Sequence, residues 1–411
     1  MGRLKQGLSS ADAATGKTKY PNSPVALQAH TNQRYRSDYP SQLENPSLST
    51  EPDRPTVHFG GPDLPRGALR DILEARIDAV PTGGSIAWAT YYFRDQALAH
   101  ALLRAKHRGV NVSVVLEKHP REPDANDPVF ELLGNGDGIG SGLHRFARPS
   151  WLPDAPIKPH LHCKIYAFSH PTPTVLIGSF NPSGDGPDDD AELIASIGDQ
   201  DAGHNLLVEH HERKFVAAMF RHLARLPWLG WPQVMNVLPQ HQSEIRDEGI
   251  RAWLFPRKQR RVVEDLLRST NQNHRVRVAM SHLKSDRGIR ILCNAAERGA
   301  EVEVVIHHTE RRAPVATEAA LLKAGARVYR YHRDDELPMH AKFMLIDNQP
   351  GTSEGSDPLK FATYGSLNFN KRSLKVNHEI FVANENPGIF AQLERRWLTI
   401  EAECQEQAAK D

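Results

Sequence analysis

The stretch HAKFMLID, residues 340–347, places a histidine, a lysine and an aspartate inside an otherwise apolar run. His340 and Lys342 are two positions apart, so in a strand their side chains point to the same face. A single H-x-K of this kind is usually no more than the exposed face of a strand. If it is half of an active site, a second half must exist elsewhere in the chain.

A counterpart lies earlier in the chain, in the stretch HLHCKIYAFS, where His162 and Lys164 repeat the spacing. Each copy is followed by a second motif, GSFN at 178–181 and GSLN at 365–368. The separation between the two H-x-K motifs is close to the separation between the two G-S-x-N motifs. Two ordered pairs of motifs in nearly the same register are far more specific than any single match.

The flanking sequence repeats as well. LLRAKHRGVNVSVVLE and LCNAAERGAEVEVVIH align glycine to glycine, Gly109 to Gly299. Apolar spacing predicts helices over 69–80, 97–109, 260–270 and 288–299, and strands over 56–59, 83–93, 110–117, 274–280 and 300–308. Strand–helix–strand alternation indicates parallel crossovers and an α/β fold, and its recurrence indicates an internal duplication.

We therefore expect two pseudo-twofold related lobes, each a mixed, mainly parallel sheet flanked by helices. The expected divisions are a flexible polar arm at 1–55, a first lobe at 56–240, a second lobe at 241–400 and a C-terminal tail at 401–411. Trp228, Trp231 and Trp253 flank the boundary between the lobes, and packing between the lobes is the default expectation for them.

Composition limits the function classes. The 411 residues carry a formal net charge of +1, which gives no global case for a nucleic-acid or membrane-surface partner. The three cysteines are far apart and suggest neither a disulfide framework nor a zinc site. The start of the chain lacks the apolar core of a secretory signal, and no apolar run approaches the roughly 18 residues that a membrane-spanning helix needs. We expect a cytoplasmic monomer, peripheral to a membrane if its substrate is a lipid.

The motifs resemble the phospholipase D superfamily, whose signature is H-x-K-x4-D followed by G-S-x-N, over roughly residues 56–400. The second copy fits fully, with Asp347 in the acidic position, and GSLNFNKRSLKVNHE is similar to the same segment of bacterial cardiolipin synthases and related phosphatidyltransferases. The first copy departs: Ser169 stands in the aspartate position, and Asn205 in the position that matches Glu379. An acid within 184–193 is a candidate replacement.

The resemblance implies that His162 attacks phosphorus to form a phosphohistidine and that His340 is the general acid and base, although the reverse assignment stays open. Lys164 and Lys342 are expected to stabilise the charge that develops on the non-bridging oxygens. For the remaining site residues we expect phosphoryl binding by Ser179, Asn181, Ser366 and Asn368, imidazole orientation by Glu379 and, more weakly, Asn205, and structural support near the second lysine by Asp347. Together these groups can replace a metal, so we expect activity without a metal or other cofactor.

Other polar clusters have simpler interpretations. His160 with His162, or His210 and His211 with Glu212, are candidate metal pairs, but no further ligand recurs at the required spacing. We expect instead that His160 lines the pocket mouth and that His210 and His211 cap a surface helix. His307 and His308 end a strand and are treated as loop histidines. The basic runs 257–261 and 310–312 are expected to be solvated first turns of helices.

The function predicted from these patterns is a phospholipase D-type phosphodiesterase that hydrolyses phospholipids or transfers phosphatidyl groups, with transient membrane contact. A nuclease or another soluble phosphodiesterase is the alternative within the superfamily, which makes nucleic acid the alternative substrate. A non-catalytic module that holds a phosphorylated ligand is a third hypothesis, because the first copy lacks two of the expected acids.

Overall fold

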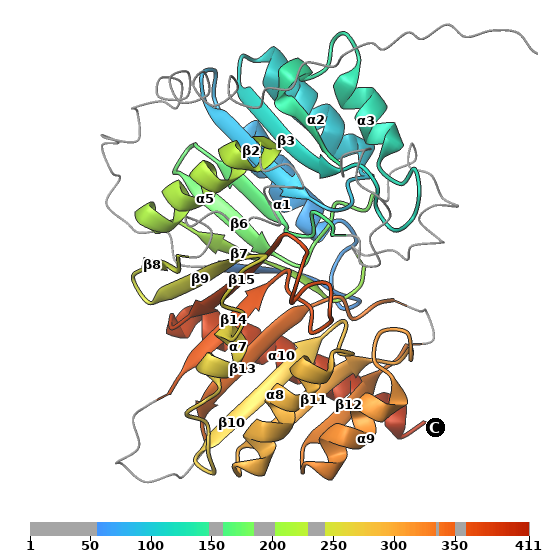
Figure 1. Ribbon diagram of the computed structural model, residues 1–411. Coiled ribbons are helices and arrows are strands. Elements are labelled where there is room, and N and C mark those ends of the chain that lie inside the picture. Colours follow the sequence, from blue (N-terminus) through green and yellow to red (C-terminus); the bar gives the residue numbers. More distant parts are fainter. Residues whose placement is uncertain are drawn as a thin grey trace, which may run out of the picture. The chain divides into compact units, whose positions relative to one another are not determined.

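The computed structural model describes residues 56–147, 159–184, 202–228, 243–333, 337–349 and 359–410. Within these ranges the chain forms two sheets, one in each lobe, as the duplication predicts (Figure 1). The expected N-terminal arm, the boundary at 240/241, Trp231 and most of the acidic stretch 184–193 lie outside the described residues.

The first lobe holds a sheet of order β1-β7-β6-β5-β2-β3-β4. Its strands are β1 (Thr56–Gly60), β2 (Ser85–Thr90), β3 (Asn111–Glu117), β4 (Leu143–Phe146), β5 (Ile165–Phe168), β6 (Thr174–Gly178) and β7 (Asn205–His210). Its α-helices are α1 (Ala68–Asp78), α2 (Gln96–His107), α3 (Asp127–Gly134) and α5 (Arg213–Arg225), and short 3-10 helices span Gly140–Gly142 and Leu226–Trp228.

The second lobe repeats this pattern with a sheet of order β12-β11-β10-β13-β14-β15-β9-β8. Its strands are β8 (Ile245–Asp247), β9 (Ile250–Phe255), β10 (His274–Met280), β11 (Glu301–His307), β12 (Arg327–Tyr331), β13 (Lys342–Asn348), β14 (Phe361–Gly365) and β15 (Glu379–Asn384). Its α-helices are α7 (Val262–Leu266), α8 (Asp286–Glu297), α9 (Val315–Lys323) and α10 (Pro387–Ala408).

Both sheets are mixed, but the parallel share is smaller than expected. Neighbouring strands are parallel within β2-β3-β4 and β10-β11-β12, and the other described pairs are antiparallel. Parallel pairing needs a long crossover, which α2 and α8 supply, whereas the short connection from β5 to β6 turns the chain back on itself. The sequence showed the helical crossovers clearly and the later strands poorly.

The aligned glycines end equivalent helices. Gly109 follows α2 and Gly299 follows α8, with φ of 86° and 91°. This left-handed conformation carries no Cβ penalty in glycine, so the chain can stop a helix and turn directly into the next strand. The register confirms the duplication: Ser85 pairs with Asn111 across β2–β3, and the residues that the same alignment makes equivalent, Arg275 and Glu301, pair across β10–β11.

Three apolar layers hold the fold together. The outer face of the first sheet packs on α1, α2 and α3, and the outer face of the second packs on α7, α8 and α9. The inner faces of both sheets, with α5 and α10, form one shared core. Trp253 belongs to the outer core of the second lobe, where it lies near Phe381, so it does not pack between the lobes as expected.

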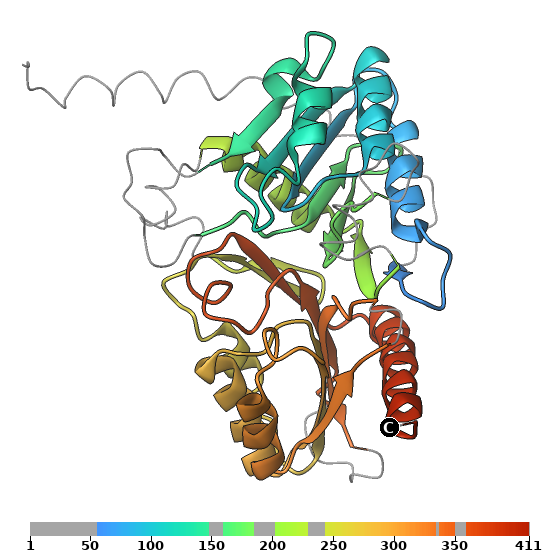
Figure 2. The ribbon, with the colours of Figure 1, turned by 90° about the vertical axis from the view of Figure 1, so that its right-hand side faces the viewer.

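The last helix, α10, contacts both lobes. α10 covers the face of the second sheet opposite α8 and α9 (Figure 2), and it also contacts β1 of the first lobe. It continues to Ala408 with Cys404 buried, so the division expected at residue 400 is wrong: residues 401–408 are part of a packed helix. None of the helices in the described ranges combines the length and apolar character needed to cross a bilayer.

Candidate active site

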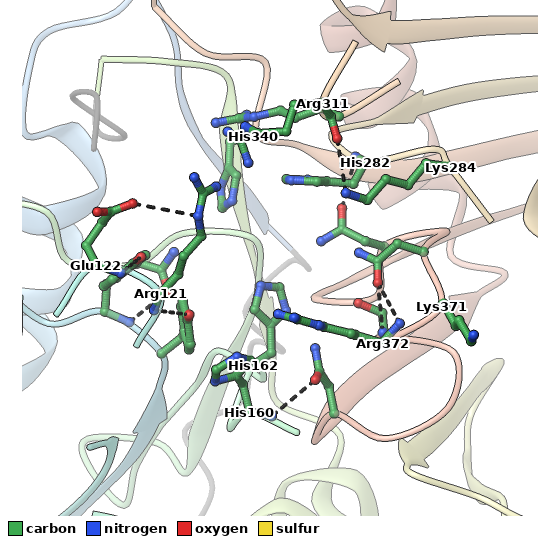
Figure 3. A pocket seen from close by; sticks show the side chains of 18 residues that line it. Arg121, Glu122, His160, His162, His282, Lys284, Arg311, His340, Lys371 and Arg372 are labelled. Carbon is green, nitrogen blue, oxygen red and sulfur yellow. Dashed lines mark hydrogen bonds and ion pairs between the residues drawn. The ribbon is translucent and has the colours of Figure 1, made fainter. Parts of the chain in front are cut away.

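The two histidines predicted for catalysis lie on segments that hydrogen-bond to the other lobe. The backbone N–H of His162 donates to the carbonyl of His378 at 2.9 Å, just before β15 of the second lobe. The backbone N–H of His340 donates to the carbonyl of His204 at 3.0 Å, just before β7 of the first lobe. Each H-x-K segment is thus fixed by the strand that carries Glu379 or Asn205 in the other lobe, and both histidines reach one cavity (Figure 3).

Each imidazole is oriented by a side chain of the opposite lobe. His162 Nδ1 lies 2.9 Å from Glu379 Oε2, and His340 Nδ1 lies 2.9 Å from Asn205 Oδ1. Both acceptors are oxygens, so Nδ1 carries the proton in each ring and Nε2 keeps its lone pair. The sequence predicted both orienting residues, and the structure adds which histidine each of them holds.

The motif serines have contacts that differ from the expected phosphate binding. Ser366 Oγ donates to Glu379 Oε2 at 2.5 Å, and Ser179 Oγ donates to Asn205 Oδ1 at 3.0 Å. Each serine oxygen also accepts a backbone N–H, from Ile380 in one lobe and Leu206 in the other. Because a hydroxyl has one proton to give, both serines are committed to the orienting side chains, and we correct their predicted role from phosphate binding to positioning.

The motif asparagines, in contrast, line the cavity as expected. Asn181 Oδ1 accepts the backbone N–H of Tyr92 at 3.3 Å, and Asn368 Oδ1 accepts that of His282 at 3.1 Å. With its oxygen held in this way, the amide nitrogen of Asn368 is oriented as a donor towards the cavity, where a phosphoryl oxygen can accept.

The two lysines lie behind the cavity wall. Lys164 Nζ donates to the carbonyl of His162 at 2.6 Å, and Lys342 Nζ donates to that of His340. Both side chains are buried and neither is among the residues that line the cavity. Burial lowers the pKa of Lys164 to about 8, against the pull of Glu379, and lowers the pKa of Lys342 well below 10.5. In the structure both lysines therefore lie against the histidine carbonyls and outside the cavity lining, where the expected contact with the non-bridging oxygens is not seen.

The environment keeps both imidazoles neutral. Burial lowers the pKa of His162 to about 4, although Glu379 opposes the shift. Burial also lowers the pKa of His340 well below 6.5, and Lys342 and Arg312 add to this effect. For Glu379, burial alone would raise the pKa, but His162 and Lys164 outweigh it and keep the carboxylate ionised. His162 therefore faces a carboxylate, while His340 faces a neutral amide.

Asp347 gives structural support at a distance from the lysine. It lies at the far end of β13 from Lys342, and its carboxylate accepts from Arg275 at 2.9 Å and Arg277 at 3.3 Å. Arg277 also bonds Glu394 of α10 at 2.9 Å, so this network holds α10 to the sheet. Asp347 thus has structural contacts, as predicted, but it does not lie near the second lysine.

The replacement of the motif aspartate by Ser169 is matched by a second replacement in the neighbouring strand. Ser169 occupies the first-lobe position of Asp347, and Ser85 occupies that of Arg275. Ser169 Oγ accepts the backbone N–H of Ser85 at 2.7 Å. Acid and base are thus replaced together, which leaves no uncompensated charge at this point of the first lobe and removes the need for a substitute acid.

The cavity has a volume of about 670 Å³, within the range of ligand sites, and most residues of its mouth were missed in the sequence. The additional lining residues are mainly aromatic or basic: Tyr91, Tyr92, Arg121, His282, Lys284, Arg311, Arg312, Lys371 and Arg372. Glu310 and Arg311 are exposed in a turn, as predicted, but this turn does not begin a helix, and Arg311 and the half-buried Arg312 line the cavity. The alignment of Gly109 with Gly299 could have found several of these residues, because it relates Tyr92 to His282 and Arg121 to Arg311 near equivalent strand ends.

The remaining predictions for polar clusters have mixed outcomes. His160 lines the cavity as expected. His210 is buried at the end of β7, where it contacts Glu212 and the hydroxyl of Tyr364, so it does not cap a surface helix. In the run 257–261, Arg257 is buried and the other four residues are exposed. In the described ranges, no group of three or more His, Cys, Asp or Glu side chains is arranged to hold a metal ion.

A duplicated α/β fold that brings two H-x-K and two G-S-x-N segments to one cavity defines a phospholipase D-like protein. The chain belongs to the family described as cardiolipin synthase, PLD-like domain, which matches residues 81–218 and 263–399, more than half of the sequence.

Curated relatives match over a shorter stretch. Cardiolipin synthase A of Serratia proteamaculans (strain 568) is 30% identical over 114 residues, and that of Yersinia pestis bv. Antiqua (strain Angola) is 28% identical over 114 residues. Each match covers 26% of this chain and 21% of the relative, so the chain spans about a fifth of the length of these proteins.

Solved structures share the fold across most of the chain. Phosphatidylserine synthase of Haemophilus influenzae Rd KW20 superposes with a TM-score of 0.58 at 13% identity, covering 85% of this chain and 86% of that one. Polyphosphate kinase of Porphyromonas gingivalis gives a TM-score of 0.52 at 14% identity, covering 84% of this chain and 46% of that one. At such identities the likeness concerns the fold.

Proposed function

We propose that the protein is a phosphodiesterase that hydrolyses phospholipids or transfers phosphatidyl groups through a phosphohistidine. The observation that carries this proposal is the pair of imidazoles, one from each lobe, that face one cavity with Nδ1 held and Nε2 left as a nucleophile or base. In-line displacement at phosphorus needs two such groups on opposite sides of one phosphoryl centre.

His162 is the nucleophile in this proposal. When Nε2 attacks phosphorus the ring becomes cationic, and the Glu379 carboxylate at 2.9 Å from Nδ1 stabilises that charge. An N–P bond forms, the P–O bond to the leaving alcohol breaks, and protonated His340 gives its proton to the departing oxygen. Burial and Lys342 lower the pKa of His340 and favour its neutral form, so His340 takes up a proton before this step, and once protonated it is a strong acid.

The second step reverses the roles. Neutral His340 removes a proton from water or from an alcohol, whose oxygen attacks phosphorus and breaks the N–P bond to regenerate His162. Water gives hydrolysis, and an alcohol gives transfer. Asn181 and Asn368, from the two lobes, flank the phosphoryl group in both steps and can donate to its non-bridging oxygens.

Two observations favour a phospholipid. The family is described by cardiolipin synthase, and the curated relatives carry that name over the matched segment. In this proposal the protein is a monomer at the membrane surface, which it reaches from the aqueous side.

Nucleic acid is the second candidate substrate. Tyr91 and Tyr92 stand beside basic residues in the cavity, and base stacking on aromatic rings next to cations is a common mode of single-strand binding.

The test is one assay on purified protein in chelator. Mixed phospholipid vesicles with a little ethanol are combined with labelled single- and double-stranded DNA, beside the variants His162→Ala, His340→Ala and Arg290→Ala. Arg290 is exposed on α8 and does not line the cavity, so its variant is a matched control. We expect phosphatidylethanol or phosphatidic acid from the wild type and the control and none from the histidine variants.

The other outcomes separate the alternatives. Cut DNA with untouched lipid supports the nuclease, and retained activity in either histidine variant removes that residue from its role. A phosphohistidine adduct that is trapped by rapid quenching and maps to His162 argues against a binding module. Absence of both adduct and products, with ligand binding retained, supports that module.

A further inference from the structure

The charged side chains that line the cavity are unevenly distributed between the two lobes. The second lobe contributes five cationic side chains to its lining, namely Lys284, Arg311, Arg312, Lys371 and Arg372. The first lobe contributes Arg121 together with Glu122, whose side chains lie 3.7 Å apart and offset each other. Figure 3 shows Lys284, Lys371 and Arg372 on one side of the cavity and Arg121 with Glu122 on the other. The five residues are called the cationic wall below.

In the described ranges the charge of the cationic wall is only weakly compensated, because Glu122 attracts Arg311 less strongly than Arg121 repels it. Among the described side chains, none of its five residues has a carboxylate partner within ion-pair distance, and the Nε of Arg312 is shielded from solvent without a hydrogen-bond partner. Burial, then Arg311 and Arg121, lowers the pKa of Arg312 to about 10, and burial with Arg311 and Arg372 lowers the pKa of Lys284. Like charges held this closely destabilise one another unless an anion enters between them.

A single phosphodiester does not account for the cationic wall. It carries one negative charge, and the pseudo-symmetric groups of both lobes, His162, His340, Asn181 and Asn368, already meet it. Arg311 corresponds to Arg121 of the first lobe, but Arg312 is not part of the symmetric machinery, because Glu122 occupies the first-lobe position that corresponds to it. The surplus charge therefore serves a part of the substrate that extends to one side of the reacting phosphorus.

At Arg312 the cationic wall reaches the side from which the leaving group departs. Arg312 Nη1 lies 3.5 Å from Ser281 Oγ, and the backbone N–H of Ser281 donates to the carbonyl of Ala341, next to His340. In-line attack by His162 places the leaving oxygen opposite its Nε2, where His340 protonates it. The leaving group thus extends along the cationic wall, and the electrically offset first-lobe side is left for the uncharged portion of the substrate.

We propose that the cationic wall is a second anion subsite and that the preferred substrate is a phospholipid whose leaving alcohol itself carries a phosphate group. This inference rests on the proposed function. The reaction is unchanged in its balance: the N–P bond forms at His162, the P–O bond to the phosphorylated alcohol breaks, and His340 gives that oxygen a proton. The product that leaves is a phosphate monoester, whose two charges the arginines and lysines meet.

The experiment compares two short-chain lipids that differ by one phosphate. Dihexanoyl phosphatidylglycerol releases glycerol and dihexanoyl phosphatidylglycerol phosphate releases glycerol phosphate, and both are kept below the concentration at which they form micelles, so surface charge plays no part. We expect the wild type to favour the phosphorylated lipid by at least about tenfold in kcat/KM, the effect of one charge-assisted contact. In the double variant Arg311→Ala/Arg372→Ala this ratio falls towards one, and in the control Arg290→Ala it does not change.

Each other outcome is decisive. Equal kcat/KM for the two lipids in the wild type overturns the second subsite and leaves the proposed function standing, provided that His162→Ala is inactive on both. A ratio that survives in the double variant, or that falls equally in the Arg290→Ala control, also overturns it. Turnover of neither lipid, with cleavage of a labelled oligonucleotide in the same buffer, overturns the proposed function and this inference with it.

Discussion

Replacing Glu379 with glutamine removes one charge from the site while keeping the shape of the side chain. The carboxylate accepts three hydrogen bonds, from His162 Nδ1 at 2.9 Å, from Ser366 Oγ and from Asn377 Nδ2 at 3.2 Å. A glutamine oxygen in the place of Oε2 keeps the first two bonds, but its nitrogen then faces the amide nitrogen of Asn377. We expect the variant to fold with a loss of about 1 kcal/mol, the value of one ordinary hydrogen bond.

The kinetic effect is larger and specific to one step. A hydrogen bond to a charged group contributes about 1.5–3 kcal/mol and one between neutral groups about 0.5–1.5 kcal/mol, so the phosphorylated, cationic His162 loses about 1–1.5 kcal/mol of stabilisation. This corresponds to a phosphorylation rate about tenfold lower. Because Glu379 raises the pKa of His162 and glutamine does not, the acidic limb of the pH–rate profile also moves to lower pH.

The assay is rapid mixing with acid quench, followed by mass spectrometry of the peptide that carries His162. The matched control is Asn205→Ala, which removes the oxygen that holds His340. If Glu379→Gln leaves the rate of adduct formation unchanged, or if the adduct maps to His340, the argument from the carboxylate is refuted and the two histidines exchange roles.

Three further predictions concern the asymmetry of the lobes and the half-buried imidazole of His162. Asn205→Asp places a carboxylate beside His340 and raises its pKa, so the limb that reports its protonated form shifts to higher pH in a pH–rate profile; an unshifted limb contradicts its role as general acid. Ser169→Asp alone changes the free energy of unfolding by less than about 0.5 kcal/mol. Adding Ser85→Arg raises the melting temperature, because it rebuilds the ion pair found at the equivalent position of the second lobe. A lower melting temperature in the double variant shows that the first-lobe backbone has diverged. His162 takes up its proton near pH 4 in the folded protein, because its pKa is about 4, but near pH 6.5 in the unfolded chain. Lowering the pH from 6.5 to 4 therefore lowers the free energy of unfolding, by on the order of 1–3 kcal/mol. Urea titrations at about pH 7, 5.5 and 4.5 should show a larger loss of unfolding free energy in the wild type than in His162→Gln, and equal losses contradict a neutral His162 imidazole in the folded protein.

The sequence alone determined the duplication and the residues at the centre of the site. The alignment of Gly109 with Gly299 depends on helix ends and strand starts, which are local features, and the structure confirms both. The two-residue period of the H-x-K motif predicted a shared face for each histidine and lysine, but only the histidines line the cavity, and each lysine lies against the histidine carbonyl. Local periodicity predicted two α/β lobes, and the family resemblance added that His162 and His340 face one site. The family comparison agrees with the first prediction, and the lining of the cavity agrees with the second.

Tertiary structure decided everything that depends on contacts between distant segments. Ser179 and Ser366 belong to the same G-S-x-N motifs as Asn181 and Asn368. Their hydroxyl protons nevertheless go to Asn205 and Glu379, because β7 and β15 run beside β6 and β14. Spacing fixes which side chains share a face, but not which acceptor is nearer.

The cationic wall shows the same limit. In the sequence, Arg311 and Arg312 stand in a short basic run that looks like any solvated turn. They line the cavity because β11 ends at the edge of the sheet where the two lobes meet, and that meeting depends on the core shared by both sheets. The sequence on its own therefore determined the repeated units and their reactive side chains, and the packing of one unit against the other decided their partners, their charge environment and the shape of the cavity.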